Sequence, residues 1–213
     1  IRGNNSFEGL FVKITLSSSG FTIEDNCGGF SFQTAKEYAF RFGRLSNSTQ
    51  ENLPHSIGRF GIGMKRALFK IGNKFEVESH CASDHFQVNV DATSWLNDPD
   101  NWKFSVQNID DISNDLGDIQ GTSIKVSELH QDVILEFSSS TFLSGLKSEI
   151  EKALNFYLEK KLKITINDNV LQKMGFEVLE FDDLKPFYRK LEIEPEPRIS
   201  IKIFAGLGEP NPN

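Results

Sequence analysis

Two glycine-rich turns carry the residue types that could hold a phosphorylated ligand. The first turn covers residues 25–30 (DNCGGF), and the second covers residues 58–65 (GRFGIGMK). Glycines in the first turn permit positive φ and let a ligand approach the backbone closely. In the second turn, glycines at positions i, i+3 and i+5 precede a helical pattern, and N–H groups at a helix N-terminus attract phosphate. Together the turns predict a site for a phosphate-bearing ligand.

The spacing of these turns differs from that of two common phosphate-binding motifs. A dinucleotide-binding fold needs GxGxxG after a strand and an acid about twenty residues later. Here the order is GxxGxG, and a polar segment precedes it; the Walker A pattern GxxxxGK[ST] is absent. Lys65 adds a positive charge at the exit of the second turn. Asp25 either receives a ligand or caps its own turn, since an aspartate after a strand does both.

The elements that must position these turns are predicted from hydrophobic periodicity. The expected helices cover residues 31–42, with Ser31 as N-cap, a segment up to Gly72 that contains Met64, Ala67, Leu68 and Ile71, and residues 140–162. The expected strands cover residues 11–16, 20–24, 74–79, 85–91, 102–106, 121–129, 163–167 and 198–204. Residues 43–57 are polar and aperiodic, which is typical of a functional lid.

Composition excludes several other classes of protein. The chain has 213 residues, a net charge of −7 and 19 Phe, which we expect to fill the core. The negative charge argues against a surface devoted to nucleic acid. Cys27 and Cys81 lack the spacing of a zinc site and indicate a reducing, intracellular setting. Since no signal peptide and no apolar run of membrane-spanning length occurs, the expected location is cytoplasmic.

Three motifs in the same order give a resemblance to a known superfamily. Residues 25–30 resemble the DxGxG adenine motif of GHKL ATPases, and residues 58–65 resemble their second glycine motif. Gly121-Thr122 resembles the Gly-Thr motif that follows. This superfamily includes the heat-shock chaperone of ninety kilodaltons, MutL, type II topoisomerase ATPase subunits and MORC proteins. The similarity covers about residues 10–167. Cys27 stands where the usual pattern has glycine, which displaces the glycine pair by one residue.

The resemblance implies a fold and a division into domains. The implied fold is an α/β two-layer sandwich, with a mixed, mainly antiparallel sheet and helices on one face. Residues 1–167 would form the ATP-binding domain, and residues 168–213 would begin a second, transducer-like α/β domain. Lys202, in the strand expected there, is a candidate for the γ-phosphate by position alone.

The resemblance also assigns roles within the site. Asp25 would accept a hydrogen bond from the exocyclic amine of adenine, and Gly29 would let the base lie against the backbone. Thr122 would support Asp25 and a base-bound water, or it is an ordinary strand threonine. Glycine N–H groups of the second turn would bind the phosphates, and Lys65 would neutralise them. The full implied nucleotide-binding set is Asp25, Asn26, Gly28, Gly29, Gly58, Phe60, Gly61, Gly63, Met64, Lys65 and Thr122.

The implied activity is hydrolysis of ATP with Mg²⁺. The superfamily's catalytic Glu and magnesium-binding Asn lie on a helix before the first strand, so both are expected upstream of Ile1; Glu8 does not lie in a helical pattern. The ATP-bound protein would form a homodimer that acts as a clamp on a protein client or DNA through other domains. Two alternatives remain: a nucleotide-binding module that does not hydrolyse, and a histidine-kinase catalytic domain, which normally ends near the Gly-Thr strand.

Overall fold

The computed structural model describes residues 6–40, 62–97, 104, 106–108, 120–175, 178–193 and 199–208. The expected lid at residues 43–57 lies outside this part, as do Gly58, Phe60 and Gly61. The chain divides into two compact units, Ile1–Lys173 and Met174–Asn213, which are described separately below. The domain boundary expected after residue 167 lies inside the first unit, in the turn between the strands Lys163–Ile166 and Asn169–Val170.

The first unit is built on one eight-stranded sheet, in the order β5-β4-β3-β6-β2-β1-β7-β8. Its neighbouring strands are antiparallel, except that β7 runs parallel to β1. The strands are β1 Phe11–Ser17, β2 Gly20–Asp25, β3 Gly72–His80, β4 His85–Asp91, β5 Val106–Asn108, β6 Gly121–Leu129, β7 Lys163–Ile166 and β8 Asn169–Val170. The predicted mixed, mainly antiparallel sheet is therefore confirmed.

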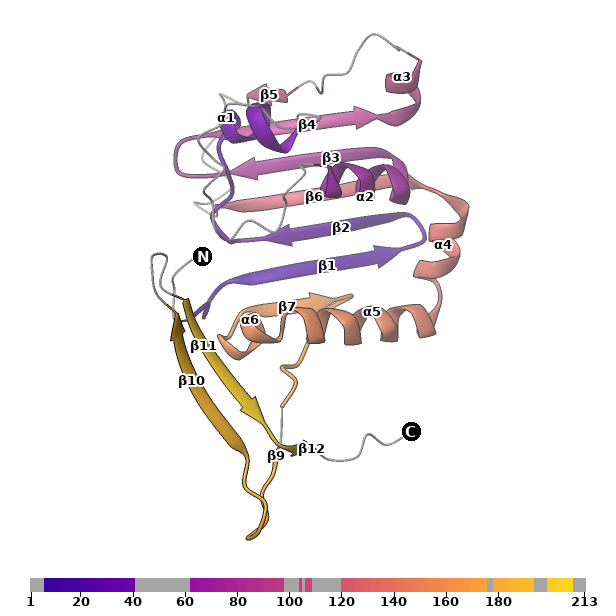
Figure 1. Ribbon diagram of the computed structural model, residues 1–213. Coiled ribbons are helices and arrows are strands. Elements are labelled where there is room, and N and C mark those ends of the chain that lie inside the picture. Colours follow the sequence, from indigo (N-terminus) through magenta and orange to yellow (C-terminus); the bar gives the residue numbers. More distant parts are fainter. Residues whose placement is uncertain are drawn as a thin grey trace. The chain divides into compact units, whose positions relative to one another are not determined.

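Helices pack on one face of this sheet (Figure 1). The helical segments of the first unit are α1 Phe32–Thr34, the π-helix η1 Ala35–Ala39, α2 Gly63–Ile71, α3 Ala92–Leu96, α4 Gln131–Phe137, α5 Ser140–Ala153 and α6 Asn155–Glu159. Ser31 caps α1 as predicted, because its side chain accepts a hydrogen bond from the Thr34 N–H. Phe40 donates its N–H to the Ala35 carbonyl, which closes the wider turn of η1.

Alternation of side chains along each strand explains why only one face is covered. On β3, Phe75 and Val77 are buried, whereas Glu76 and Glu78 point to the opposite face and stay partly exposed. The inward side chains form two clusters. In one cluster Ile14 and Ile164 of the sheet pack with Phe137 of α4 and with side chains of α5 and α6; in the other, Phe86 and Val88 pack with Leu68 of α2 and with side chains of α1 and η1.

The predicted single helix over residues 140–162 is wrong. Helix α5 ends at Ala153, Leu154 leaves the helical conformation with φ −110° and ψ 15°, and α6 begins at Asn155. Ile150 before this break and Leu158 after it nevertheless both pack into the core. Apolar spacing reports which residues are buried, so it does not detect a change in backbone direction when burial continues across it.

The second unit contains two small antiparallel pairs. Strand β10 (Phe187–Ile193) pairs with β11 (Ile199–Ala205), and β9 (Val178–Leu179) pairs with β12 (Leu207–Gly208). The strand predicted at residues 198–204 corresponds to β11. The transducer-like identity of this unit stays a prediction.

Candidate functional site

Three polar side chains lie in one row where β2 and β3 end and β6 begins. Asp25 is the register partner of Thr122, and Thr122 is the register partner of Ser79. All three lie at inward-facing positions, on the face that the helices cover. Directly opposite residues in antiparallel strands have Cβ atoms about 5 Å apart, so these side chains form one short polar row.

The first glycine-rich turn folds back over this row. The Asp25 carboxylate accepts a hydrogen bond from the Cys27 N–H at 2.7 Å, which starts the turn. Gly28 donates its N–H to the Gln120 carbonyl at 3.2 Å and ties the turn to the residue that precedes β6. Gly28 and Gly29 have φ values of +100° and +60°, a region that favours glycine.

Two glycines are required by close backbone contacts. A Cβ atom on Gly29 would lie 2.2 Å from the His80 carbonyl oxygen, and one on Gly121 would lie 1.9 Å from the Asp25 carbonyl oxygen. The resemblance explains Gly29 by the approach of a base. In the structure the backbone of β3 makes the close approach, so Gly29 is needed to seat the turn on the sheet. Whether a base also lies there stays a prediction.

Asn26 holds the turn from its other side. Its side-chain oxygen accepts the Phe11 N–H at 2.7 Å, and its amide nitrogen donates to the Gly9 carbonyl at 2.9 Å. These bonds attach the start of β1 to the turn. They give Asn26 a structural role beside the nucleotide-binding role that the resemblance implies.

Ser79 is a residue of this site that sequence reasoning missed. Its side chain is buried, at 1% exposure, among otherwise apolar inward positions of β3. Its hydroxyl accepts the Phe30 N–H at 2.9 Å and lies 3.4 Å from the Thr122 hydroxyl. No motif marks a serine near the end of a strand; only the pairing of β3 with β6 places it beside Thr122.

The N-terminus of α2 is directed toward the same end of these strands. Helix α2 lies over β3 and β6 in Figure 1 and leads directly into β3, so its Gly63 end points back toward the end of β3. Gly63, Met64 and Lys65 form its first turn, and Ile62 at the N-cap makes no side-chain capping bond. Backbone N–H groups at such an end suit an anion.

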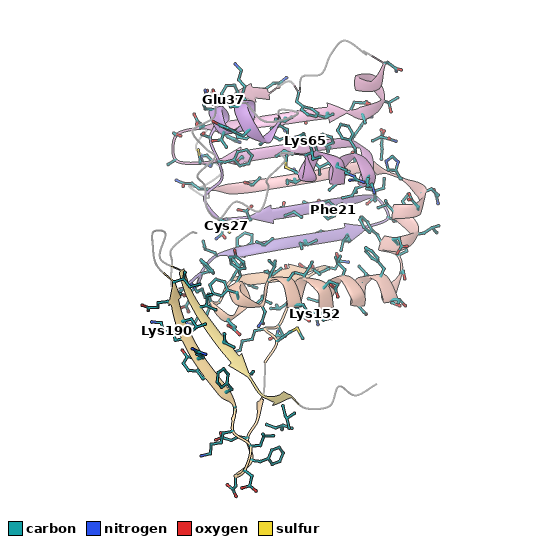
Figure 2. The ribbon with its side chains drawn as sticks, in the orientation of Figure 1. Phe21, Cys27, Glu37, Lys65, Lys152 and Lys190 are labelled. Carbon is teal, nitrogen blue, oxygen red and sulfur yellow. The ribbon has the colours of Figure 1, made fainter. Side chains whose placement is uncertain are left out.

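Lys65 does not extend into solvent in this structure. It lies on α2 over the sheet (Figure 2) and is 2% exposed, and its amine donates to the Ala39 carbonyl at 2.7 Å. Burial lowers the pKa of this amine. Lys65 thus links the start of α2 to the end of η1. Its predicted contact with phosphate stays a prediction.

Cys27 reports the electrostatics beside Asp25. Its thiol is partly buried at the end of β2 (Figure 2), and its pKa is raised to about 11. Burial is the largest cause, followed by the charge of Asp25 and a hydrogen bond to it. The thiol therefore lies close to the Asp25 carboxylate, the acceptor at the end of β2 that could receive a hydrogen-bond donor of a ligand.

Residues outside this row have structural partners. Glu8, the acid nearest the start of the chain, is exposed and pairs with Lys161 at 2.9 Å.

In the described ranges, no group of three or more His, Cys, Asp or Glu side chains could hold a metal ion. Within those ranges there is also no helix whose length and apolar character would suit a membrane span.

The fold and the polar row define an α/β sandwich with a candidate nucleotide site where β2 and β3 end and β6 begins. A family model described as histidine kinase-, DNA gyrase B- and HSP90-like ATPase matches residues 8–122. The chain belongs to this family, and the matched range runs from before β1 to Thr122 in the polar row. A comparison with curated proteins found no match.

Proposed function

We propose that this chain binds ATP where β2 and β3 end and β6 begins, and that it is the nucleotide-binding core of an ATPase. Nucleotide binding would drive conformational change and dimerisation in the full protein, in the manner of the chaperone-, MutL- and MORC-like members of the superfamily. A protein client or DNA would be handled through other domains.

One observation supports this proposal above the others. The Asp25 carboxylate lies in register with Thr122, and the glycine-rich turn that follows Asp25 is attached to both β6 and β3. This arrangement holds the Asp25 carboxylate in a fixed position at the end of β2, where it can accept a hydrogen bond from the amine of adenine. The N-terminus of α2 is directed toward the same strand ends, and its backbone N–H groups would bind phosphate.

Turnover would need more than this binding site. Hydrolysis requires an oriented water, a base and Mg²⁺ on the β- and γ-phosphates. Magnesium would arrive with the triphosphate. The resemblance places the base and a metal-binding Asn on a helix before the first strand, and we assign neither role to a described residue.

The test of this proposal is the substitution Asp25→Asn. We expect ATP binding to weaken by about 1–3 kcal/mol, because a charged acceptor becomes a neutral amide whose NH₂ group opposes the donor amine. Calorimetric titration of parent and variant with ATP measures the change. Glu24→Gln is the matched control, since Glu24 is the neighbouring acid on the opposite face of β2 and its variant should bind as the parent does. Equal affinities of the parent and the Asp25 variant would contradict the proposal.

A further inference from the structure

A buried hydroxyl at Ser79 needs an explanation, because the other inward side chains near it on β3 are apolar. Phe75 and Val77 precede it at the same face, with exposures of 3% and 0%. Burying an unpaired hydroxyl is costly, so a serine in this position is stable only with partners. The structure supplies partners from the glycine-rich turn and from β6.

The possible hydrogen bonds of Ser79 can be counted. A serine hydroxyl has one hydrogen to donate and two lone pairs to accept. Phe30 N–H fills one lone pair at 2.9 Å. The carbonyls of Phe30 and Gly121, at 3.3 Å and 3.5 Å, can only accept, so either of them can take the single Ser79 hydrogen. The remaining lone pair faces Thr122 Oγ1 at 3.4 Å, which can donate.

Either hydroxyl of the Ser79–Thr122 pair can donate by geometry alone, and Thr122 is the donor when the Ser79 hydrogen goes to a carbonyl. When Thr122 donates its hydrogen to Ser79, its own oxygen is left with lone pairs for a ligand. Asp25, its register partner on the other side, also presents only acceptors when ionised. The row then offers acceptors alone, which attract an amine and repel a carbonyl at the same place on a purine.

We propose that Ser79 is a positioning residue that holds Thr122 as a hydrogen-bond acceptor and thereby favours a purine with an amine at C6 over one with a carbonyl. The inference rests on the proposed ATP site and deepens it. Without Ser79, the Thr122 hydroxyl can rotate and donate to a carbonyl. The loss of selectivity comes from this rotation, and affinity for the phosphates does not depend on it.

ATP and inosine triphosphate test this inference, because inosine carries a carbonyl where adenosine carries the amine. We expect the parent to prefer ATP, and Ser79→Ala to reduce the ATP-to-ITP affinity ratio by about three- to tenfold, the size of one neutral hydrogen bond. Affinity for inorganic triphosphate should not change. Ser127→Ala is the control, since Ser127 lies exposed on the other face of β6 and its variant should keep the parent ratio.

A double-mutant cycle separates positioning from general loosening of the fold. In a Thr122→Val background, Ser79→Ala should leave the ATP-to-ITP ratio unaltered, because the hydroxyl it directs is gone. Ser79→Cys keeps most of the side-chain volume and should lower the ratio as Ser79→Ala does, with a circular dichroism spectrum like the parent's.

The outcomes distinguish this inference from the function it rests on. A parent that binds no ATP contradicts the proposed function and removes the basis of the inference. A parent that prefers ATP, with folded Ser79 variants of unchanged ratio, overturns the role of Ser79 alone. Equal effects of Ser79→Ala with and without the Thr122 hydroxyl also overturn it.

Discussion

Gly28 and Gly29 are neighbours with positive φ, yet the space around them differs. A Cβ atom on Gly29 would meet the His80 carbonyl at 2.2 Å, whereas a Cβ atom on Gly28 would have no neighbour within 4 Å. Both alanine variants carry the strain of positive φ, about 1–2 kcal/mol. We expect Gly29→Ala to lose a further 1–3 kcal/mol, roughly, through overpacking.

Urea unfolding of the two glycine variants measures this difference. The Gly28 variant serves as the matched control, because it shares the strain and lacks the collision. Similar losses of unfolding free energy in both variants would show that the turn moves away from β3 at little cost.

Cys27 gives a second measurable property at the residue scale. Because burial and the charge of Asp25 raise its pKa to about 11, we expect its rate of alkylation by iodoacetamide, in a Cys81→Ser background, to keep rising with pH up to about that value. Asp25→Asn should move this pKa down. A rate that levels off near pH 9 in the parent would contradict the electrostatic link.

The sign of the pH effect on stability follows from the same shift. The pKa of the native thiol is about 11, whereas the pKa of an unperturbed thiol is 9.0. The native state therefore binds more protons than the unfolded state between these values, and the contribution of Cys27 to the unfolding free energy falls as the pH rises through that window.

The residues of the site were predictable to different extents. Asp25, Gly29 and Thr122 match motifs of the GHKL superfamily, and that resemblance assigns them to one site; the register of β2 and β6 does bring Asp25 beside Thr122. Ser79 belongs to no motif, and its place beside Thr122 depends on which strand pairs with β6, a long-range choice that local pattern does not encode. The phosphate contact that the resemblance implies for Lys65 stays a prediction, and no sequence pattern indicates that its amine donates to the Ala39 carbonyl.

At the scale of elements, α5 offers a direct test of helix propensity. Gly145 is exposed in the interior of this helix, and an added Cβ would have no neighbour within 4 Å. We expect Gly145→Ala to raise the unfolding free energy by about 0.5–1 kcal/mol, because the unfolded chain loses backbone entropy. Denaturant unfolding measures the change.

Gly63 provides the control for this helix prediction. It also has open space around it, but it is the first residue of α2, where the helical conformation is less demanding. Gly63→Ala should therefore gain less stability than Gly145→Ala. A loss of stability in the Gly145 variant would mean that α5 makes a close contact there in solution.

Strands with clean alternation were predicted within one or two residues, whereas segments with other patterns were not. In β1, β2 and β6 a half-covered sheet forces apolar and polar side chains to alternate, and that signal is local. Helix α4 was missed because Val133, Ile134 and Leu135 form a continuous apolar run that fits either a strand or a helix. Strand β10 was not predicted although Leu191 and Ile193 alternate with charged residues, since most of its side chains are exposed and the apolar signal is short.

At the scale of the whole chain, the two units differ in how their backbone hydrogen bonds are protected. Strands β3 and β6 lie inside the eight-stranded sheet, each between two partners and under packed side chains. Strands β10 and β11 form a two-stranded sheet on which Phe187, Ile193 and Ile201 are at least 36% exposed. An isolated pair of strands is only marginally stable in water.

Hydrogen exchange read by mass spectrometry should separate the two units. We expect the amides of β3 and β6 to exchange only through opening of the whole sheet, because no smaller motion frees both neighbours of an interior strand. Amides of β10 and β11 should exchange at least about a hundredfold faster, since their pairing opens locally. Addition of ATP should slow exchange in residues 25–30 and leave β10 unchanged. Equal protection of β10 and β3 without nucleotide would show that the apolar face of the small sheet is covered in solution.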